Sequence, residues 1–279
     1  MASTVGFERY NEVLPVAKLT AIAAEQASNY QSAAPFPHIY LDNVFPEAVL
    51  DAVVNEFPEP GDPSWHQFNN PREIKLASKG DDRLGPNARA FITNLNSGVF
   101  IEFLERLTGI KGLIPDPHLA GGGMHQILPG GKLSVHIDFN RHERLNLERR
   151  LNVLVYLNRD WDESYGGHFE LWNRDMTRAE VRILPLFNRM ALFSTSEISW
   201  HGHPNPLTCP PGRARRSIAL YYYTVGRPEA EQAAEHSTVF VERPGELLFT
   251  DKPPLRERLK SVAKDWVPPI VSRALGRSQ

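Results

Sequence analysis

Short runs in which apolar and polar residues alternate fill the chain between about residues 114 and 224. Alternation with a period of two places successive side chains on opposite faces of a β-strand. Gly and Pro separate these runs, as expected where a chain turns after each strand. The pattern predicts strands at residues 124–128, 133–138, 151–157, 168–172, 181–184, 190–194 and 215–224. Many short strands joined by turns favour an antiparallel sandwich or barrel, of which the jelly roll is one form.

The residues before this region combine one short strand with helices. A short strand is predicted at residues 35–41, followed by a helix that Pro46 opens and Pro58 ends. Apolar residues spaced three or four positions apart predict a longer helix over about residues 87–107. The same spacing predicts a further helix after about residue 252, which Pro268 ends. We expect this last helix to pack against the protein or to form a homodimer.

Together these patterns predict a mainly β protein of the α+β class with three regions. Residues 1–112 would form a support region of strand and helices that is integral to the domain. Residues 113–226 would form the β core. Residues 227–279 would be a C-terminal extension with a helix.

The composition narrows the class of protein and the kind of metal site. The chain has 279 residues, of which 41% are hydrophobic, so it is long enough to bury a large core. Its formal net charge of −2 gives no general attraction to nucleic acid or to an anionic membrane. The single cysteine, Cys209, excludes an intrachain disulfide and a thiolate-rich metal site. Any metal must therefore be bound by histidine and carboxylate.

The sequence gives no sign of a membrane span or of a secretory signal. No apolar run approaches the roughly 20 residues that cross a bilayer. Residues 1–10 lack a basic start followed by an apolar core. We therefore expect a cytoplasmic protein with no membrane span.

The strongest candidates for chemistry are His136 and Asp138 on the predicted strand 133–138. Residues i and i+2 of a strand share a face, so the imidazole and the carboxylate point the same way. Two histidines and one carboxylate hold non-haem Fe(II) on one face and leave other metal positions open. The pair supplies two of these three ligands. Because His-x-Asp occurs in many strands by chance, its weight depends on a third ligand.

The candidates for the third ligand are His201 and His203, which follow the predicted strand 190–194. Both have the same strand parity, so both could face the first pair. His201 follows the strand more closely, and Pro204 indicates that the chain already turns at His203. We favour His201, although the spacing leaves both residues open.

The predicted strand 215–224 carries a candidate anchor for a carboxylate. Arg215 shares one face with Ser217 and Ala219, whereas Arg216 lies on the other face. An arginine followed by small residues leaves room for a bound carboxylate, and its planar fork suits pairing through two hydrogen bonds. Solvated arginines on an edge strand are the alternative interpretation.

Several segments, in this order, resemble the prolyl 4-hydroxylase-like branch of the Fe(II)/2-oxoglutarate-dependent dioxygenases. The resemblance covers roughly residues 120–225. It rests on residues 124–140, residues 151–172, residues 199–204 and the run Arg215-Arg216-Ser217. The fold that the resemblance implies is a double-stranded β-helix, which agrees with the predicted strands.

The resemblance also implies roles for five residues. His136, Asp138 and His201 would be the iron ligands. Arg215 would bind the distal carboxylate of 2-oxoglutarate, because the arginine of the family precedes a small residue by two positions. Tyr156 matches a tyrosine that helps to hold this carboxylate in part of the family.

The activity implied is hydroxylation of an aliphatic C–H bond, with decarboxylation of 2-oxoglutarate to succinate and CO2. Fe(II), 2-oxoglutarate and O2 would be required, and ascorbate is a candidate reductant. In related halogenases a small residue replaces the carboxylate ligand so that chloride can bind, so Asp138 favours hydroxylation. The substrate stays open between a prolyl or other protein residue and a small molecule.

Two rival classes are also compatible with the sequence. A cupin-like metalloenzyme that needs no 2-oxoglutarate would leave Arg215 and Tyr156 unexplained. A non-catalytic β-barrel binding module would have little need for three intact metal ligands. Among the other histidines, His142 lies in the polar loop 139–149, where we expect a solvated side chain, and His125 is expected to pack or to face the surface.

Overall fold

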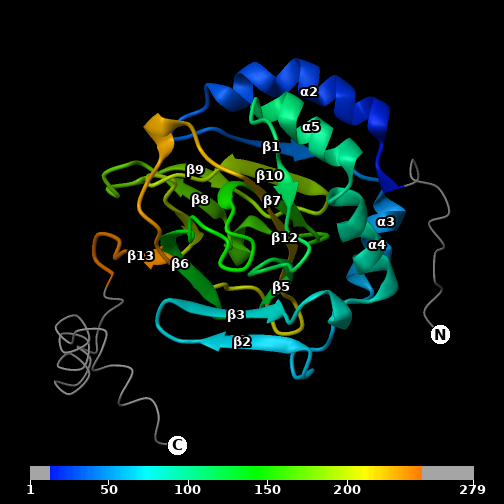
Figure 1. Cartoon of the computed structure of the whole chain (residues 1–279). Coiled ribbons are helices and arrows are strands. Elements are labelled where there is room, and N and C mark those ends of the chain that lie inside the picture. Colours follow the sequence, from blue (N-terminus) through cyan, green and yellow to red (C-terminus); the bar gives the residue numbers. More distant parts are fainter. Residues whose placement is uncertain (1–12, 247–279) are drawn as a thin grey trace, which may run out of the picture. The chain divides into compact units, whose positions relative to one another are not determined.

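A curled antiparallel sheet of thirteen strands dominates the computed structural model, which describes residues 13–246 (Figure 1). The strand order is β1-β10-β7-β12-β5-β3-β6-β11-β8-β9, with β2 paired to β3, β4 to β12 and β13 to β6. The strands are β1 (His38–Asp42), β2 (Trp65–Asn69), β3 (Glu73–Ser78), β4 (Ile114–Pro115), β5 (Gly123–Ile127), β6 (Lys132–Ile137), β7 (Glu148–Tyr156), β8 (Phe169–Trp172), β9 (Ala179–Ile183), β10 (Arg189–Ser194), β11 (His201–His203), β12 (Arg215–Thr224) and β13 (Val239–Phe240).

The sheet curls until strands from distant places in its order share one core. Phe169 and Leu171 of β8 pack in one buried cluster with Phe193 of β10 and Tyr156 of β7. This packing makes a nearly closed barrel with an inner cavity. The predicted mainly β fold, a double-stranded β-helix with supporting N-terminal helices, is confirmed. Each of the eight predicted strands, seven in the β core and one before it, is present within a few residues.

Alternation along β7 separates the two faces of the sheet. Leu151, Val153 and Val155 belong to the large core that includes the helices, whereas Leu154 and Tyr156 pack inside the barrel. Helices α2 (Val16–Gln31), α3 (Glu47–Val54), α4 (Pro86–Leu95) and α5 (Gly98–Thr108) contribute to the outer core. Figure 1 shows α2 and α5 lying beside β1 and β10. The helices thus cover one face and leave the other to the cavity.

The prediction of one helix over about residues 87–107 is wrong, because two helices occupy this segment. The first, α4, ends at Leu95, and α5 begins at Gly98 after Ser97, which has an extended backbone with ψ of 159°. The Asn94 side chain donates to the Ala90 carbonyl, and the Asn94 backbone carbonyl accepts from the Ser97 amide. The polar run Asn94–Ser97 therefore supplies local hydrogen bonds that compete with a continuous helix.

Other differences concern short or polar elements. The sequence pattern predicts no element for α2, β2 or β11, and all three are present. None of the helices within residues 13–246 has the length and the apolar run that a bilayer crossing requires. The helix predicted after residue 252 lies outside the described residues, and with it the homodimer. The division into three regions stays a prediction.

Candidate active site

Two histidines face each other across neighbouring strands inside the barrel. β6 pairs with β11, and His136 lies directly opposite His201, with ring centroids 4.4 Å apart. Each ring donates from Nδ1 to a backbone carbonyl two residues earlier, that of Ser134 at 2.9 Å and that of Ser199 at 2.7 Å. Each Nε2 therefore keeps a lone pair for another partner. Burial and the neighbouring His201 ring lower the pKa of His136, which keeps it neutral.

Asp138, just beyond β6, faces both rings. Its Oδ1 lies 3.6 Å from Nε2 of His136, and its Oδ2 lies 3.4 Å from Nε2 of His201. Oδ2 also accepts a hydrogen bond from Asn152 at 2.7 Å and lies 3.0 Å from Nη2 of Arg149. Burial acts to raise the pKa of Asp138, but Arg149 and the imidazoles hold it well below its usual range. The carboxylate is therefore ionised.

The residue types and their arrangement fit a divalent metal ion. One ligand atom from each of His136, Asp138 and His201 lies within 4.8 Å of the other two, and the three form the one such cluster within residues 13–246. Neutral imidazole and carboxylate are the ligand types of non-haem Fe(II) sites. The hydrogen bonds at both Nδ1 atoms fix the ring orientation, as outer partners do at metal sites. The sequence-predicted triad is thus brought together.

Arg149 is a functional candidate that the sequence analysis did not single out. It is almost completely buried, at 1% exposure, and its guanidinium carbon lies 3.5 Å from the centre of the Tyr221 ring and 4.5 Å from that of Phe139. Its Nε donates to Asn152, which in turn donates to Asp138. In the sequence, Arg149 is the last residue of the polar loop 139–149. In the structure it belongs to β7, and pairing of β7 with β12 directs its side chain into the barrel.

Arg215 lines the same cavity as the triad, and the buried Tyr156 side chain lies beside Arg215. Nε of Arg215 donates to the Gly167 carbonyl at 2.8 Å, and Nη2 lies 3.4 Å from the Tyr156 hydroxyl. The Tyr156 pKa is raised by burial, so the phenol stays protonated. Gly167 has a φ of +72°, and a Cβ there would lie 3.0 Å from Cδ of Arg215. A glycine is therefore needed beside the arginine.

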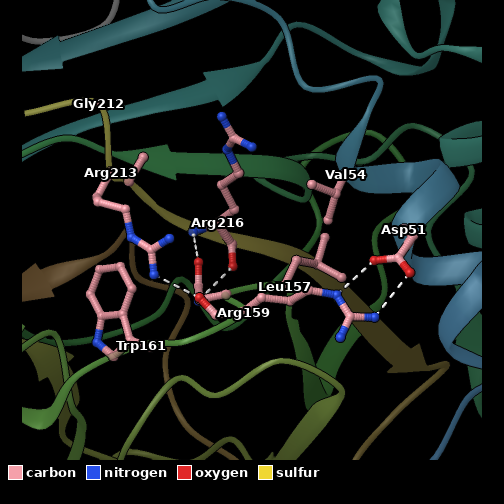
Figure 2. A pocket seen from close by; sticks show the side chains of 10 residues that line it. Asp51, Val54, Leu157, Arg159, Trp161, Gly212, Arg213 and Arg216 are labelled. Atoms are coloured by element: carbon pink, nitrogen blue, oxygen red, sulfur yellow. Dashed lines mark hydrogen bonds and ion pairs between the residues drawn. The ribbon is translucent and has the colours of Figure 1, made fainter.

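Arg216 points to the opposite side of the sheet, as the strand alternation predicts. Figure 2 shows it in an outer pocket with Arg159, Arg213 and Trp161. Nε of Arg216 donates to Gln126 at 2.8 Å. This pocket shares no lining residue with the cavity that holds the triad. Of the two arginines that the sequence left as candidates, only Arg215 can reach a molecule in the barrel.

The cavity around the triad is lined by polar groups from both sides of the barrel. Arg215, Ser217 and His125 line it together with Lys75 of β3, which pairs with Glu73 at 3.0 Å. His203 also lines it and is 3% exposed. Burial, followed by the nearby Arg215 and Lys75, holds the pKa of His203 well below its usual value. Asp138 is the one carboxylate among the lining residues.

The expectation of a solvated His142 is wrong. Its ring is 1% exposed, and Nε2 lies 3.2 Å from the Asp116 carboxylate. Nδ1 accepts from the amides of Arg144 and Leu145, each at 3.2 Å. His142 therefore organises the loop after Asp138, and the polar sequence around it gave no sign of this burial.

A second, larger cavity of about 650 Å³ adjoins the first. Phe139, which follows Asp138, lines it together with Gly121, Arg141 and His236. The Tyr221 hydroxyl, from the wall of the metal cavity, donates to the Gly121 carbonyl at 2.9 Å. This hydrogen bond connects a lining residue of one cavity with a lining residue of the other.

Comparison with known families supports the assignment. Residues 122–223 match the 2OG-Fe(II) oxygenase superfamily. These residues form a 2OG-Fe(II) oxygenase domain. The matched segment contains the triad together with Tyr156 and Arg215. The superfamily predicted from the sequence is therefore confirmed for this segment, and the enzyme is a dioxygenase that uses Fe(II) and 2-oxoglutarate.

Solved structures with a similar fold extend beyond this segment. A prolyl hydroxylase from Trichoplax adhaerens, in complex with a peptide fragment of the hypoxia inducible factor oxygen degradation domain, superposes with a TM-score of 0.53 at 19% identity. The match covers 75% of this chain and 92% of that one. A prolyl-4-hydroxylase from Pseudomonas putida gives a TM-score of 0.50 at 14% identity, over 73% of this chain and 99% of that one.

Oxygenases with other chemistry share the fold as well. SnoK, a non-haem α-ketoglutarate-dependent carbocyclase from nogalamycin biosynthesis, gives a TM-score of 0.50 at 10% identity, over 72% of this chain and 84% of that one. No curated protein matched the chain. At these identities the likeness shows the fold, so the substrate of the oxygenase has to be argued from its own residues.

Proposed function

We propose that this oxygenase hydroxylates an aliphatic C–H bond of its substrate. The observation that carries the proposal is that one cavity holds the His136–Asp138–His201 cluster together with Arg215. Three ligands on one face of the metal leave room for a bidentate 2-oxo acid and for O2. An intact carboxylate at Asp138 occupies the position that a halide needs, which favours hydroxylation.

In the proposed site the protein residues bind, orient and exclude water. His136, Asp138 and His201 would hold Fe(II), which supplies the activation of O2. Arg215 and the Tyr156 hydroxyl would bind the distal carboxylate of 2-oxoglutarate through charge-assisted hydrogen bonds. In the overall reaction, one oxygen atom of O2 enters the new hydroxyl group and the other enters succinate, with release of CO2.

Arg149 would set how Asp138 binds the metal. The Oδ2 atom is already in contact with Arg149 and Asn152, whereas His136 is the one partner of Oδ1 within residues 13–246. Oδ1 is therefore the atom left for the metal, and the carboxylate would bind through one oxygen. The buried guanidinium also offsets the negative charge of the site.

The larger cavity beside Phe139 is the proposed substrate site. Its volume of about 650 Å³ lies in the range of ligand pockets, roughly 300–1,000 Å³. Nε of Arg141 is buried there without a hydrogen-bond partner among the described residues. A substrate with a carbonyl or carboxylate oxygen would satisfy this donor. Both a peptide segment and a small molecule meet this requirement, and the peptide-bound Trichoplax adhaerens enzyme favours testing peptides first.

The test is a screen for succinate release across proline-containing peptides, amino acids and sugars, in the presence of Fe(II) and 2-oxoglutarate. A substrate should raise succinate release and gain one oxygen atom in its mass. A cupin-like enzyme that needs no 2-oxoglutarate would oxidise a substrate without forming succinate, and that result would overturn the proposal.

Three finer assignments complete the proposal. Ascorbate is proposed as the reductant that restores Fe(II) after turnover without substrate. A cytoplasmic location and a homodimer through the C-terminal helix remain predictions from the sequence.

A further inference from the structure

His203 lines the cavity around the triad but is not one of the three predicted metal ligands. It follows His201 by two residues on β11, and the register shifts between them, so that His203 lies opposite Leu133 of β6. The cluster of ligand atoms within 4.8 Å contains His136, Asp138 and His201 and does not contain His203. The ring nevertheless lines the same cavity as Arg215.

Both ring nitrogens of His203 lack a hydrogen-bond partner among the described residues, although both are buried. A buried polar group without a partner destabilises the folded protein, because it has lost its hydrogen bonds to water. His136 and His201 differ in this respect, because each uses Nδ1 to bind a backbone carbonyl. The protein therefore positions those two rings in advance and leaves His203 for a molecule that enters the cavity.

The charges around His203 indicate the kind of molecule. Arg215, Lys75 and His125 lie near it along the cavity wall, and Asp138 is the one lining carboxylate. A cationic molecule that entered the cavity beside His203 would be repelled by Arg215 and Lys75. An anion that reaches Arg215 would accept hydrogen bonds from His203 and from Arg215 at the same time.

We propose that His203 donates a hydrogen bond to the distal carboxylate of the co-substrate, as a third donor beside Arg215 and Tyr156. This inference rests on the proposed function, since it assigns 2-oxoglutarate to the cavity. Three donors at the carboxylate end would make the site selective for 2-oxo acids that carry a second carboxylate. A 2-oxo acid with an alkyl end would leave His203 and Arg215 without their partner.

The experiment measures binding of 2-oxoglutarate to Mn(II)-loaded protein by isothermal titration calorimetry without turnover. A hydrogen bond to a charged group contributes about 1.5–3 kcal/mol, so His203→Leu should weaken 2-oxoglutarate by roughly 10- to 100-fold. Binding of 2-oxobutyrate, which has no second carboxylate, should be unchanged. His203→Gln, which keeps an N–H donor, should retain most of the affinity.

His38→Leu is the matched control, because His38 bonds its own Phe36 carbonyl and does not line the cavity. It should leave 2-oxoglutarate binding unchanged. The thermal midpoint without ligand separates a binding role from a structural one. The thermal midpoint of His203→Leu should equal or exceed that of wild type, because leucine removes two buried polar atoms without partners.

Three outcomes would overturn the inference. The first is that His203→Leu binds 2-oxoglutarate as tightly as wild type does. The second is that His203→Leu loses as much affinity for 2-oxobutyrate as for 2-oxoglutarate. The third is that His203→Leu no longer binds Mn(II). If wild-type protein with Mn(II) bound no 2-oxoglutarate, the proposed function itself would fail, and the two failures are therefore distinguishable.

Discussion

At the scale of single residues, the buried cation Arg149 beside the Asp138 carboxylate has the largest consequence for stability. Removing one partner of a buried ion pair leaves an uncompensated charge and costs about 3–5 kcal/mol. Arg149→Met should lower the unfolding free energy of the metal-free protein by about this amount in urea denaturation. Arg178→Met, which removes an exposed arginine paired with Glu180, should have little effect.

The same variant makes a prediction about the metal. In Arg149→Met, Asp138 lacks its cation, so a divalent ion should restore more stability to this variant than it adds to wild type. Thermal unfolding with and without Mn(II) measures the difference. An equal increase in both proteins would show that Arg149 does not offset the charge of Asp138.

Arg215 and Arg216 are adjacent and chemically identical, but they lie on opposite faces of β12. A lysine keeps the charge and loses the planar fork, so Arg215→Lys should weaken 2-oxoglutarate by roughly tenfold or more. Arg216→Lys should leave that affinity unchanged, because its side chain lies in the outer pocket. Titration of the two Mn(II)-loaded variants with 2-oxoglutarate measures both affinities. A larger loss in Arg216→Lys than in Arg215→Lys would make Arg216 the residue that binds the carboxylate.

Much of the candidate site could be predicted from the sequence, because period-two alternation in strands places His136 with Asp138 and Arg215 with Ser217. The surroundings could not. Arg149 becomes a partner of Asp138 only through pairing between distant strands, and nothing in a polar loop distinguishes a buried arginine from a solvated one.

At the scale of elements, alanine substitutions of the two glycines at the ends of α5 should change the stability of the protein in opposite directions. Gly109 ends the helix with a φ of +77°, which alanine adopts at a cost of about 1 kcal/mol. Gly98 begins the helix with open space around a Cβ, where alanine stabilises by roughly 0.4–1 kcal/mol. Denaturant unfolding of Gly109→Ala and Gly98→Ala measures both. Shifts of the same sign would contradict this account of the helix ends.

The short strand β13 pairs with β6, the strand that carries His136. Its Phe240 ring lies 5.2 Å from the His136 ring. The Val241 amide donates to the Val135 carbonyl at 3.1 Å. Val241→Pro removes this donor, so amide hydrogen exchange in residues 132–138 should become faster. Val241→Ala keeps the amide and should exchange as wild type does, whereas no difference between the variants would exclude a supporting role.

Elements were predictable where hydrophobic periodicity was strong, as in the seven strands. They were missed where local hydrogen bonds decide the outcome, as at the break between α4 and α5. β11 was also missed, because its residues His201–His203 are too few and too polar to show alternation. Its position is set by pairing with β6 and β8, which a sequence pattern does not show.

At the scale of the whole molecule, the barrel separates two tasks. The helices cover one face of the sheet and contribute to the large core, while the opposite face surrounds the cavity lined by His136, Asp138, His201 and Arg215. The domain match and the shared fold identify the class of enzyme. The larger cavity, which we propose for the substrate, is lined by Phe139 next to Asp138 in the chain and is connected to the triad cavity by the Tyr221–Gly121 hydrogen bond.

The central claim is that Fe(II) and 2-oxoglutarate bind together at His136, Asp138 and His201. The most direct measurement is an anaerobic visible spectrum during titration with both. A weak charge-transfer band should appear only when Fe(II) and 2-oxoglutarate are both present, and it should be absent in His201→Ala. A wild-type spectrum without this band, or an unchanged band in His201→Ala, would contradict the claim.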